Sequence, residues 1–136
     1  MHWFKNQLER QEDGNFSTTL GGVGTVEVGS PVEFNGSADT TNPEELLIAS
    51  INSCIAMTFM YFAKKLELAV DSYSSRAEGE VVKDEGGFRF SQAKVTAAVK
   101  TSDPDAQQKL AKITELTEKY CLVSRSMSFP IQFVVE

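Results

Sequence analysis

The sequence predicts an α+β domain with the element order β-β(-β)-α-β-β-α-β, built around one long buried helix. Three observations predict this fold. Short strand-like segments separated by turns fill the first forty residues, a long apolar run follows a strong helix-start signal, and two alternating segments form a predicted hairpin before a second helix. The 136 residues are enough for one core. We therefore expect a single domain over residues 1–136.

The N-terminal strands are expected to be short. Strands are predicted at Phe16–Leu20 and at residues 25–28, on either side of the glycine-rich turn at residues 21–24. A further extended piece is expected at residues 31–34. Turn-forming residues then occupy positions 35–41.

The long helix has the clearest start signal in the chain. Asn42 is a good N-cap, Pro43 suits the first helical position, and Glu45 follows Asn42 by three residues, as in a capping box. We expect this helix to span residues 43–66. Apolar side chains occupy nearly every side of its middle: Leu46, Leu47, Ile48, Ile51, Ile55, Met57, Phe59, Met60 and Phe62.

A helix that is apolar all round must be buried all round. A chain of this length is too short to wrap such a helix alone, so the pattern predicts a partner subunit. The stretch at residues 46–63 carries no charge, but it contains Ser50, Asn52, Ser53 and Thr58. These polar residues favour a helix buried in protein over a membrane span.

A hairpin and a second helix complete the domain. Strands are expected at residues 70–82 and 88–100, with a bulge near Ser91 and Gln92, where the alternation changes phase. The second helix is expected to start at Asp103 as N-cap, with Pro104 at the first helical position. The last strand, at residues 128–135, is interrupted by Pro130, which indicates an edge position or a strand start.

Composition and charge exclude several partners. The formal net charge is −6 and there is no basic run, which argues against a nucleic-acid or anionic membrane surface. The first residues show no signal-peptide pattern, so we expect a cytoplasmic protein with reduced thiols. Two cysteines and one histidine are too few for a structural zinc site, which needs four ligands, and no metal is expected.

The two cysteines are the residues that can carry chemistry. Each is either an inert core residue or a reactive thiol, and position alone leaves both readings open. Cys54 lies in the middle of the first helix, and Cys121 lies at the end of the second. Glu44 precedes Cys54 by roughly 15 Å along the helix axis. It can therefore cooperate with Cys54 only through a bridging arginine or across a dimer.

Two stretches of sequence resemble a known family. Residues 41–54 read TNPEELLIASINSC, and residues 120–124 read YCLVS. These stretches resemble the two cysteine motifs of the OsmC/Ohr family of organic hydroperoxide reductases, and the element order is similar over the whole chain. The resemblance implies an OsmC-like fold in an intertwined homodimer, with active sites at the subunit interface.

The resemblance also implies a thiol peroxidase of the oxidative stress response. Cys54 would attack the peroxide and become a sulfenic acid, and Cys121 would then form a disulfide with it. An external thiol or dithiol, such as a lipoyl protein, would reduce that disulfide, so no bound cofactor is expected. Glu44 matches the family glutamate that orients an arginine toward the thiolate.

This chain departs from the family at that arginine. In the Ohr branch the arginine follows a Gly-Gly pair, but here Val23 follows Gly21-Gly22. In the OsmC branch it shortly precedes the Asn-Pro-Glu motif, where this chain has Val32, Glu33 and Phe34. Arg125, four residues after Cys121, and Arg10, from a partner's N-terminal hairpin, are the candidates to replace it.

Two functions therefore compete. The first is reduction of organic hydroperoxides, with hydrogen peroxide as a second candidate substrate, in an apolar pocket whose candidate lining residues are Met57, Phe59, Tyr61 and Phe129. The second is a non-catalytic dimer of the same fold that binds a small apolar ligand or senses oxidants. The missing family arginine favours the second, and the two motif cysteines favour the first.

Overall fold

The computed structural model describes residues 1–136 and confirms the α+β class, with two sheets and three α-helices. In chain order the elements are β1 (Gln7–Arg10), β2 (Phe16–Leu20), β3 (Gly24–Val28), a 3-10 helix (Val32–Phe34), α1 (Pro43–Lys65), β4 (Ser72–Asp84), β5 (Gly87–Lys100), α2 (Ala106–Tyr120), α3 (Leu122–Arg125) and β6 (Ile131–Val135). The chain forms two compact units, Met1–Leu47 and Ile48–Glu136, and α1 starts in the first and continues into the second. The expected single domain stays a prediction.

The N-terminal unit contains an antiparallel sheet with the strand order β1-β2-β3. Its third strand is not the expected segment at residues 31–34 but β1, which precedes β2. Residues 32–34 instead form a 3-10 turn, closed by hydrogen bonds from Phe34 N–H to Pro31 O and from Asn35 N–H to Val32 O. Local bonding at Pro31 thus replaces strand pairing.

The start and end of α1 follow from local chemistry. Asn42 Oδ1 accepts a hydrogen bond of 2.7 Å from the Glu45 N–H, which confirms Asn42 as the N-cap. At the other end Glu67 adopts a left-handed φ of 58°, and the Leu68 N–H donates to Ala63 O. This arrangement satisfies the last carbonyls of the helix.

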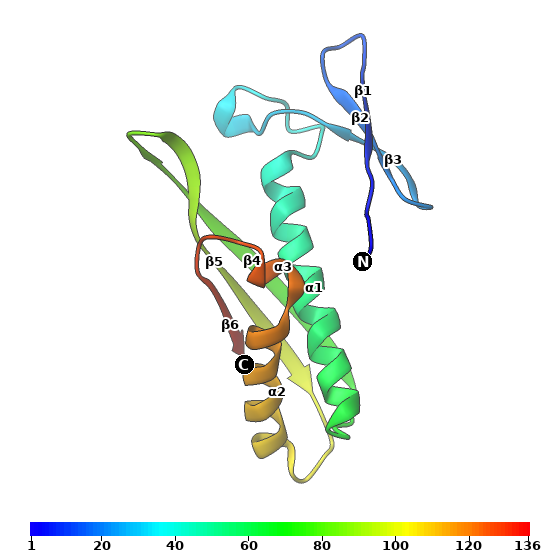
Figure 1. The fold of residues 1–136 in the computed structure, drawn as a ribbon, viewed down its shortest axis with the longest axis vertical. Helices are drawn as coiled ribbons and strands as arrows, with labels where there is room; N and C mark the ends of the chain where they lie inside the picture. The colour runs from blue at the N-terminus through cyan, green and yellow to red at the C-terminus, as the bar shows by residue number, and fades with distance from the viewer. The chain divides into compact units, whose positions relative to one another are not determined.

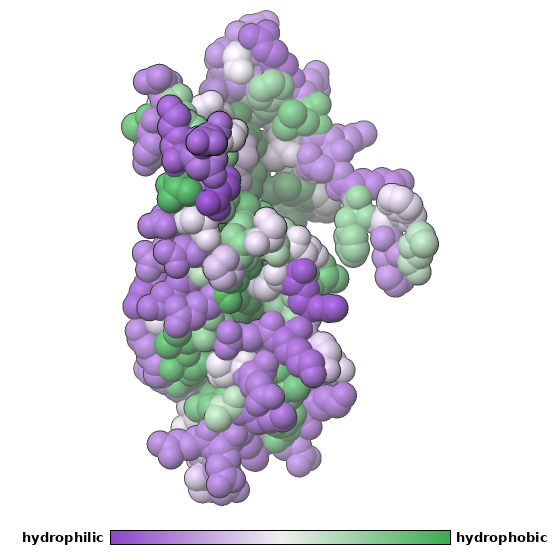
Figure 2. All heavy atoms as spheres, turned by 60° about the vertical axis from the view of Figure 1, so that its left-hand side comes forward, coloured by the Kyte–Doolittle hydropathy of each residue, from purple (hydrophilic) through white to green (hydrophobic).

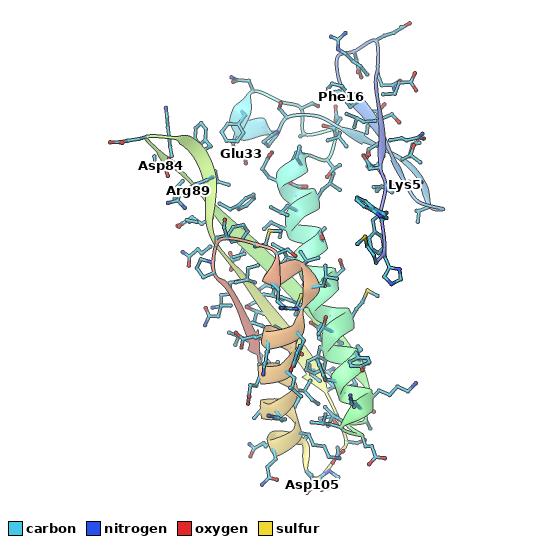
Figure 3. All side chains as sticks on the ribbon, viewed as in Figure 1. Lys5, Phe16, Glu33, Asp84, Arg89 and Asp105 are labelled. Atoms are coloured by element: carbon cyan, nitrogen blue, oxygen red, sulfur yellow. The ribbon has the colours of Figure 1, made fainter.

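The C-terminal unit is built on a sheet with the order β4-β5-β6. In this sheet β4 runs antiparallel to β5, and β6 runs parallel to β5. The expected bulge is confirmed, because Glu80 pairs with Gln92 while Val81 pairs with Phe90, which leaves Ser91 extra. At the end of the hairpin the Arg89 guanidinium donates to the Asp84 carboxylate (Figure 3). The edge position of the last strand is also confirmed, although β6 begins only after Pro130.

The core of this unit lies where α1 and α2 cover one face of the sheet (Figure 1). The Phe59 ring packs against Tyr73, with ring centroids 5.4 Å apart, and against Phe133 at 6.1 Å. The Ser75 hydroxyl on β4 donates to the Asn52 side chain on α1 at 2.7 Å. Other side chains with no exposed surface are Ile51, Val95 and Ile113.

The second helix begins later than expected. Asp105, not Asp103, is the N-cap of α2, and Pro104 lies in the preceding turn (Figure 3). The Asp103 carboxylate accepts hydrogen bonds from the Asp105 N–H at 2.8 Å and from Lys109 Nζ at 2.9 Å. The Lys109 ammonium also donates to Glu67 O, which ties α2 to the end of α1. Because the Asp103 side chain stabilises this local turn, α2 begins only after Asp105.

The long helix is not buried on every side within one chain, as expected for a chain too short to wrap it alone, and the partner subunit stays a prediction. Met57 is 73 % exposed and Tyr61 is 59 % exposed, and only 28 % of the apolar 18-residue window of α1 is buried. By length and composition α1 is apolar enough to cross a membrane, a test that the core helix of a soluble protein also passes. Hydrophobic side chains also reach the surface between hydrophilic ones in Figure 2.

The N-cap of α1 gives a stability prediction. Asn42→Ala removes the acceptor for the Glu45 N–H, and we expect it to lower the free energy of unfolding by about 1 kcal/mol. Ser53→Ala is the matched control, because its exposed hydroxyl bonds only to carbonyls of the same helix. The control should stay within about 0.5 kcal/mol of wild type in chemical denaturation. Equal stability of the two variants would contradict a capping role for Asn42.

Candidate active site

The first thiol belongs to the middle of α1. Cys54 is half-buried, and one turn later the Thr58 hydroxyl donates to the Cys54 carbonyl at 2.7 Å. Phe59, five residues after Cys54, is held in the core by Tyr73 and Phe133. Since successive helical residues are separated by about 100°, this anchor fixes the direction in which the Cys54 side chain leaves the helix.

The second thiol lies between two helices. Cys121 follows the last residue of α2, takes an extended conformation and has no exposed surface. Its N–H donates to Thr117 O at 3.0 Å, and its carbonyl accepts the Arg125 N–H at 3.0 Å. The residue thus ends α2 and starts α3, and both backbone bonds hold it in place.

The structure brings these two thiols together. Both are free, and the Cys54 thiol is near enough to interact with Cys121 and raise its pKa. Burial is the larger cause and acts in the same direction, whereas hydrogen bonds from Ser124 lower the pKa of the Cys121 thiol. The two sulfurs therefore differ: one is partly accessible, and the other is enclosed and favours the protonated form.

A groove of about 740 Å³ lies near the C-terminal ends of α1 and α2, and neither cysteine is among its lining residues. Its lining residues come from the ends of α1 and α2: Met57, Thr58, Tyr61, Phe62, Lys65, Leu66, Leu116 and Tyr120. The groove starts one helical turn after Cys54, at Thr58, and includes Tyr120, the neighbour of Cys121. Most of its surface is apolar, so it suits an apolar molecule.

Only some of the expected pocket residues line this groove. Met57 and Tyr61 do so, but Phe59 is fully buried in the core because two helical steps turn it away from Met57. Phe129 stacks on Phe90, with ring centroids 5.6 Å apart, and does not line the groove either.

Glu44 belongs to the N-terminal unit and is half-buried there. Its Oε1 atom is buried without a hydrogen-bond partner, and the side chain lines a cavity of about 330 Å³ with residues such as Phe16, Val28 and Phe34. A buried carboxylate oxygen without a donor is unfavourable, so this position suits a cationic or hydrogen-bonding group.

The two arginine candidates are both exposed. Arg125 ends α3, and its side chain makes no hydrogen bond or ion pair. Its backbone N–H nevertheless bonds to Cys121 O, which places it one helical turn from the buried thiol. Arg10 ends β1 in the N-terminal unit. No group of histidine, cysteine, aspartate and glutamate side chains is arranged to hold a metal ion.

Sequence reasoning did not assign a role to Ser124. Its hydroxyl donates to Cys121 Sγ at 3.3 Å. The signal was present in the YCLVS motif, where Ser124 follows Cys121 by three residues. That spacing places the hydroxyl near the sulfur only if a helical turn begins at the cysteine, as α3 does.

Comparison with known proteins identifies relatives. A family model described as OsmC-like protein matches residues 36–136. A protein from Bacillus subtilis named uncharacterized protein YmaD is 24% identical over 124 residues, which cover 84% of this chain and 83% of that protein.

Solved structures share the fold. An OsmC-like protein of unknown function from Vibrio cholerae aligns with a TM-score of 0.86 at 19% identity, with 100% of both chains covered. A structure described as an organic hydroperoxide resistance protein OsmC, from Legionella pneumophila, aligns with a TM-score of 0.81 at 18% identity, covering 100% of this chain and 98% of that one. At these identities the likeness shows the fold.

The unequal environments of the two thiols predict unequal labelling. In the reduced, folded protein iodoacetamide should modify Cys54 faster than Cys121 by more than about tenfold, because alkylation needs an accessible thiolate. Cys121 is buried, and its raised pKa favours the protonated thiol, so it offers neither accessibility nor thiolate. Peptide mass mapping over time measures both rates, and denatured protein should lose the difference. Faster labelling of Cys121 in the folded protein would contradict this assignment.

Proposed function

Because the chain belongs to the OsmC-like protein family, we propose that it reduces organic hydroperoxides through Cys54 and Cys121. The observation that carries the proposal is the thiol pair itself. A half-buried thiol interacts with a fully buried one. An apolar groove is lined by Met57 and Thr58, which follow Cys54 within about one helical turn, and by Tyr120, which precedes Cys121. The names of solved relatives that include organic hydroperoxide resistance support the same reaction class.

The first step oxidises Cys54. Its thiolate attacks the distal oxygen of the hydroperoxide, the O–O bond breaks, and the alkoxide leaves and takes a proton to become an alcohol. The peroxide gains two electrons, and the sulfur becomes a sulfenic acid. Cys54 suits this role because it is the more accessible of the two thiols.

The second step closes a disulfide. The Cys121 sulfur attacks the sulfenic sulfur of Cys54, and hydroxide leaves and is protonated to water. An external thiol or dithiol, such as a lipoyl protein, then reduces the disulfide by thiol exchange and restores both thiols. This cycle needs no bound cofactor, and it fits the reducing cytoplasm, where thiol reductants are maintained.

The groove supplies the preference for organic peroxides. Met57, Tyr61 and Leu116 give it an apolar surface. Burial of an alkyl or aryl group there contributes roughly 0.8 kcal/mol per methylene group, a gain that hydrogen peroxide does not have. Hydrogen peroxide is therefore expected to be the poorer substrate.

A cation near Cys54 would favour its thiolate. Arg125 is one source, because its guanidinium has no ion pair and its backbone bonds to Cys121. Arg10 of a second copy is the other. Glu44, which has a buried carboxylate oxygen without a donor, matches the family glutamate that would orient such a guanidinium.

The cysteine variants test the reaction. Cys54→Ser should abolish peroxide consumption with dihydrolipoamide as reductant, because no sulfur remains to attack the peroxide. Cys121→Ser should still oxidise one Cys54 per chain but form no intramolecular disulfide. Peroxide assays and intact-protein mass spectrometry measure these outcomes, with Ser53→Ala as the control. Full activity in Cys54→Ser would refute the proposal.

The second candidate function is a non-catalytic dimer that binds a small apolar ligand or senses oxidants. The observation that favours it is that the chain has no arginine at either position where the family resemblance places one. Wild-type protein that binds an apolar probe in the groove but consumes no peroxide would select this function.

The exposed face of α1 supports a homodimer. One side of the helix is docked on the sheet through Phe59 and Asn52, while Met57, Met60 and Tyr61 remain exposed. Contiguous exposed apolar side chains on a soluble protein mark an interaction surface. We assign this surface to a second copy of the chain and not to lipid or nucleic acid.

Solution mass tests this assignment. Light scattering should give about twice the 15.0 kDa chain mass. The double variant Met57→Lys and Tyr61→Lys should shift the protein toward monomer, because it buries two charges in an apolar contact. Val81→Lys, at an exposed apolar residue on β4, is the control and should remain a dimer. A wild-type protein that is monomeric or needs detergent to stay in solution would contradict the homodimer.

A further inference from the structure

The proposed cycle uses the Cys121 sulfur as a thiolate twice, and the following inference rests on that cycle. Cys121 attacks the sulfenic acid as a thiolate, and it leaves as a thiolate when the disulfide is reduced. Burial opposes this charge, and so does the nearby Cys54 thiol. A group that stabilises negative charge at this sulfur is therefore required for both steps.

Ser124 is placed to be that group. Its hydroxyl donates to Cys121 Sγ at 3.3 Å, within the turn that the Arg125 N–H closes on the Cys121 carbonyl. Ser124 is half-buried, so its hydroxyl is partly shielded from competing water. The Ser124 N–H also lowers the pKa of the thiol, although it does not reach the geometry of a capping hydrogen bond.

Ser124 is the side chain that donates a hydrogen bond to this sulfur. Its hydrogen bonding lowers the pKa of the Cys121 thiol, whereas burial and the nearby Cys54 thiol raise it. The neighbouring hydroxyl of Thr117 is turned away, since it donates to Ile113 O at 2.7 Å.

We propose that Ser124 is a positioning residue that holds Cys121 ready to act as a thiolate, both as the attacking and as the leaving sulfur. In the first role the Cys121 thiolate bonds to the Cys54 sulfur, and hydroxide departs from the sulfenic acid. In the second role an external thiolate attacks Cys54, the S–S bond breaks, and the electron pair goes to Cys121. The Ser124 hydroxyl donates to that sulfur in both steps.

The same geometry assigns the direction of disulfide reduction. The Cys121 sulfur has no exposed surface, so an external thiolate reaches the half-buried Cys54 sulfur instead. The mixed disulfide then forms on Cys54. Exchange is faster when the leaving thiol has a lower pKa, so a hydrogen bond at Cys121 accelerates attack at Cys54.

Titration of Cys121 tests the charge stabilisation without any peroxide. In the Cys54→Ser protein, Ser124→Ala should move the midpoint of Cys121 thiolate absorbance upward by about one pH unit, because a hydrogen bond to a charged group is lost. Ser124→Thr keeps a hydroxyl, so in the same Cys54→Ser background it should restore the midpoint measured with Ser124 present. Ser126→Ala is the matched control, since that exposed hydroxyl donates to Leu122 O. An unchanged midpoint in Ser124→Ala would overturn the inference.

Rapid mixing with an organic hydroperoxide tests the role in the cycle. With both cysteines present, Ser124→Ala should form the Cys54 sulfenic acid at the wild-type rate. It should then close the disulfide roughly tenfold more slowly, and the rate of this step should rise with pH at a higher pH than in wild type. Equal rates of disulfide closure in Ser124→Ala and wild type would overturn the inference. Absence of both sulfenic acid and disulfide in peroxide-treated wild type would instead refute the proposed function, and the titration would still decide whether Ser124 stabilises the thiolate.

Discussion

The packing of α1 against the sheet β4-β5-β6 is the interaction on which the thiol pair depends. Phe59 fills the space between Tyr73 and Phe133, and this contact sets the rotation of the helix about its axis. A second close contact joins Ile48 on α1 to Gly79 on β4. This contact needs a glycine, because a Cβ at position 79 would lie 2.5 Å from Ile48 Cδ1. With helix height and rotation fixed in this way, Cys54 meets a cysteine that lies far away in sequence.

The chemistry follows from the asymmetry between the two thiols. Core packing encloses Cys121 completely, which protects it from external oxidants and raises its pKa. Cys54 remains partly accessible, so in the proposed cycle a peroxide and a reductant would reach the same sulfur. Enclosure of one partner therefore gives an order to the reaction, but it also creates the need for a hydrogen-bond donor at the enclosed sulfur. Ser124 meets that need from within the same short turn.

Features with a local cause were predictable from the sequence. The N-cap at Asn42 and the bulge at Ser91 depend on neighbouring residues, and both were found. Strand β1 was missed because its four residues are all exposed and include a single apolar residue, Leu8, which is too few to show an alternating pattern. The orientation of Phe59 and the proximity of the two thiols were not predictable, because both depend on how α1 docks on the sheet. The exposed face of α1 likewise depends on what lies outside the chain.

Two unsatisfied features remain after the chain has folded, one in each unit. Glu44 in the N-terminal unit has a buried carboxylate oxygen without a donor, at a cost of about 1–3 kcal/mol. Met57 and Tyr61 in the C-terminal unit expose large apolar side chains. The chain also has no arginine at either position where the family resemblance places the partner of Glu44. A second copy of the chain would remove both deficits, by covering the helix face and by bringing a guanidinium to the carboxylate. If Arg10 of the second copy supplies that guanidinium, the dimer would be a condition of the chemistry, because the cation that favours the Cys54 thiolate would come from outside the chain.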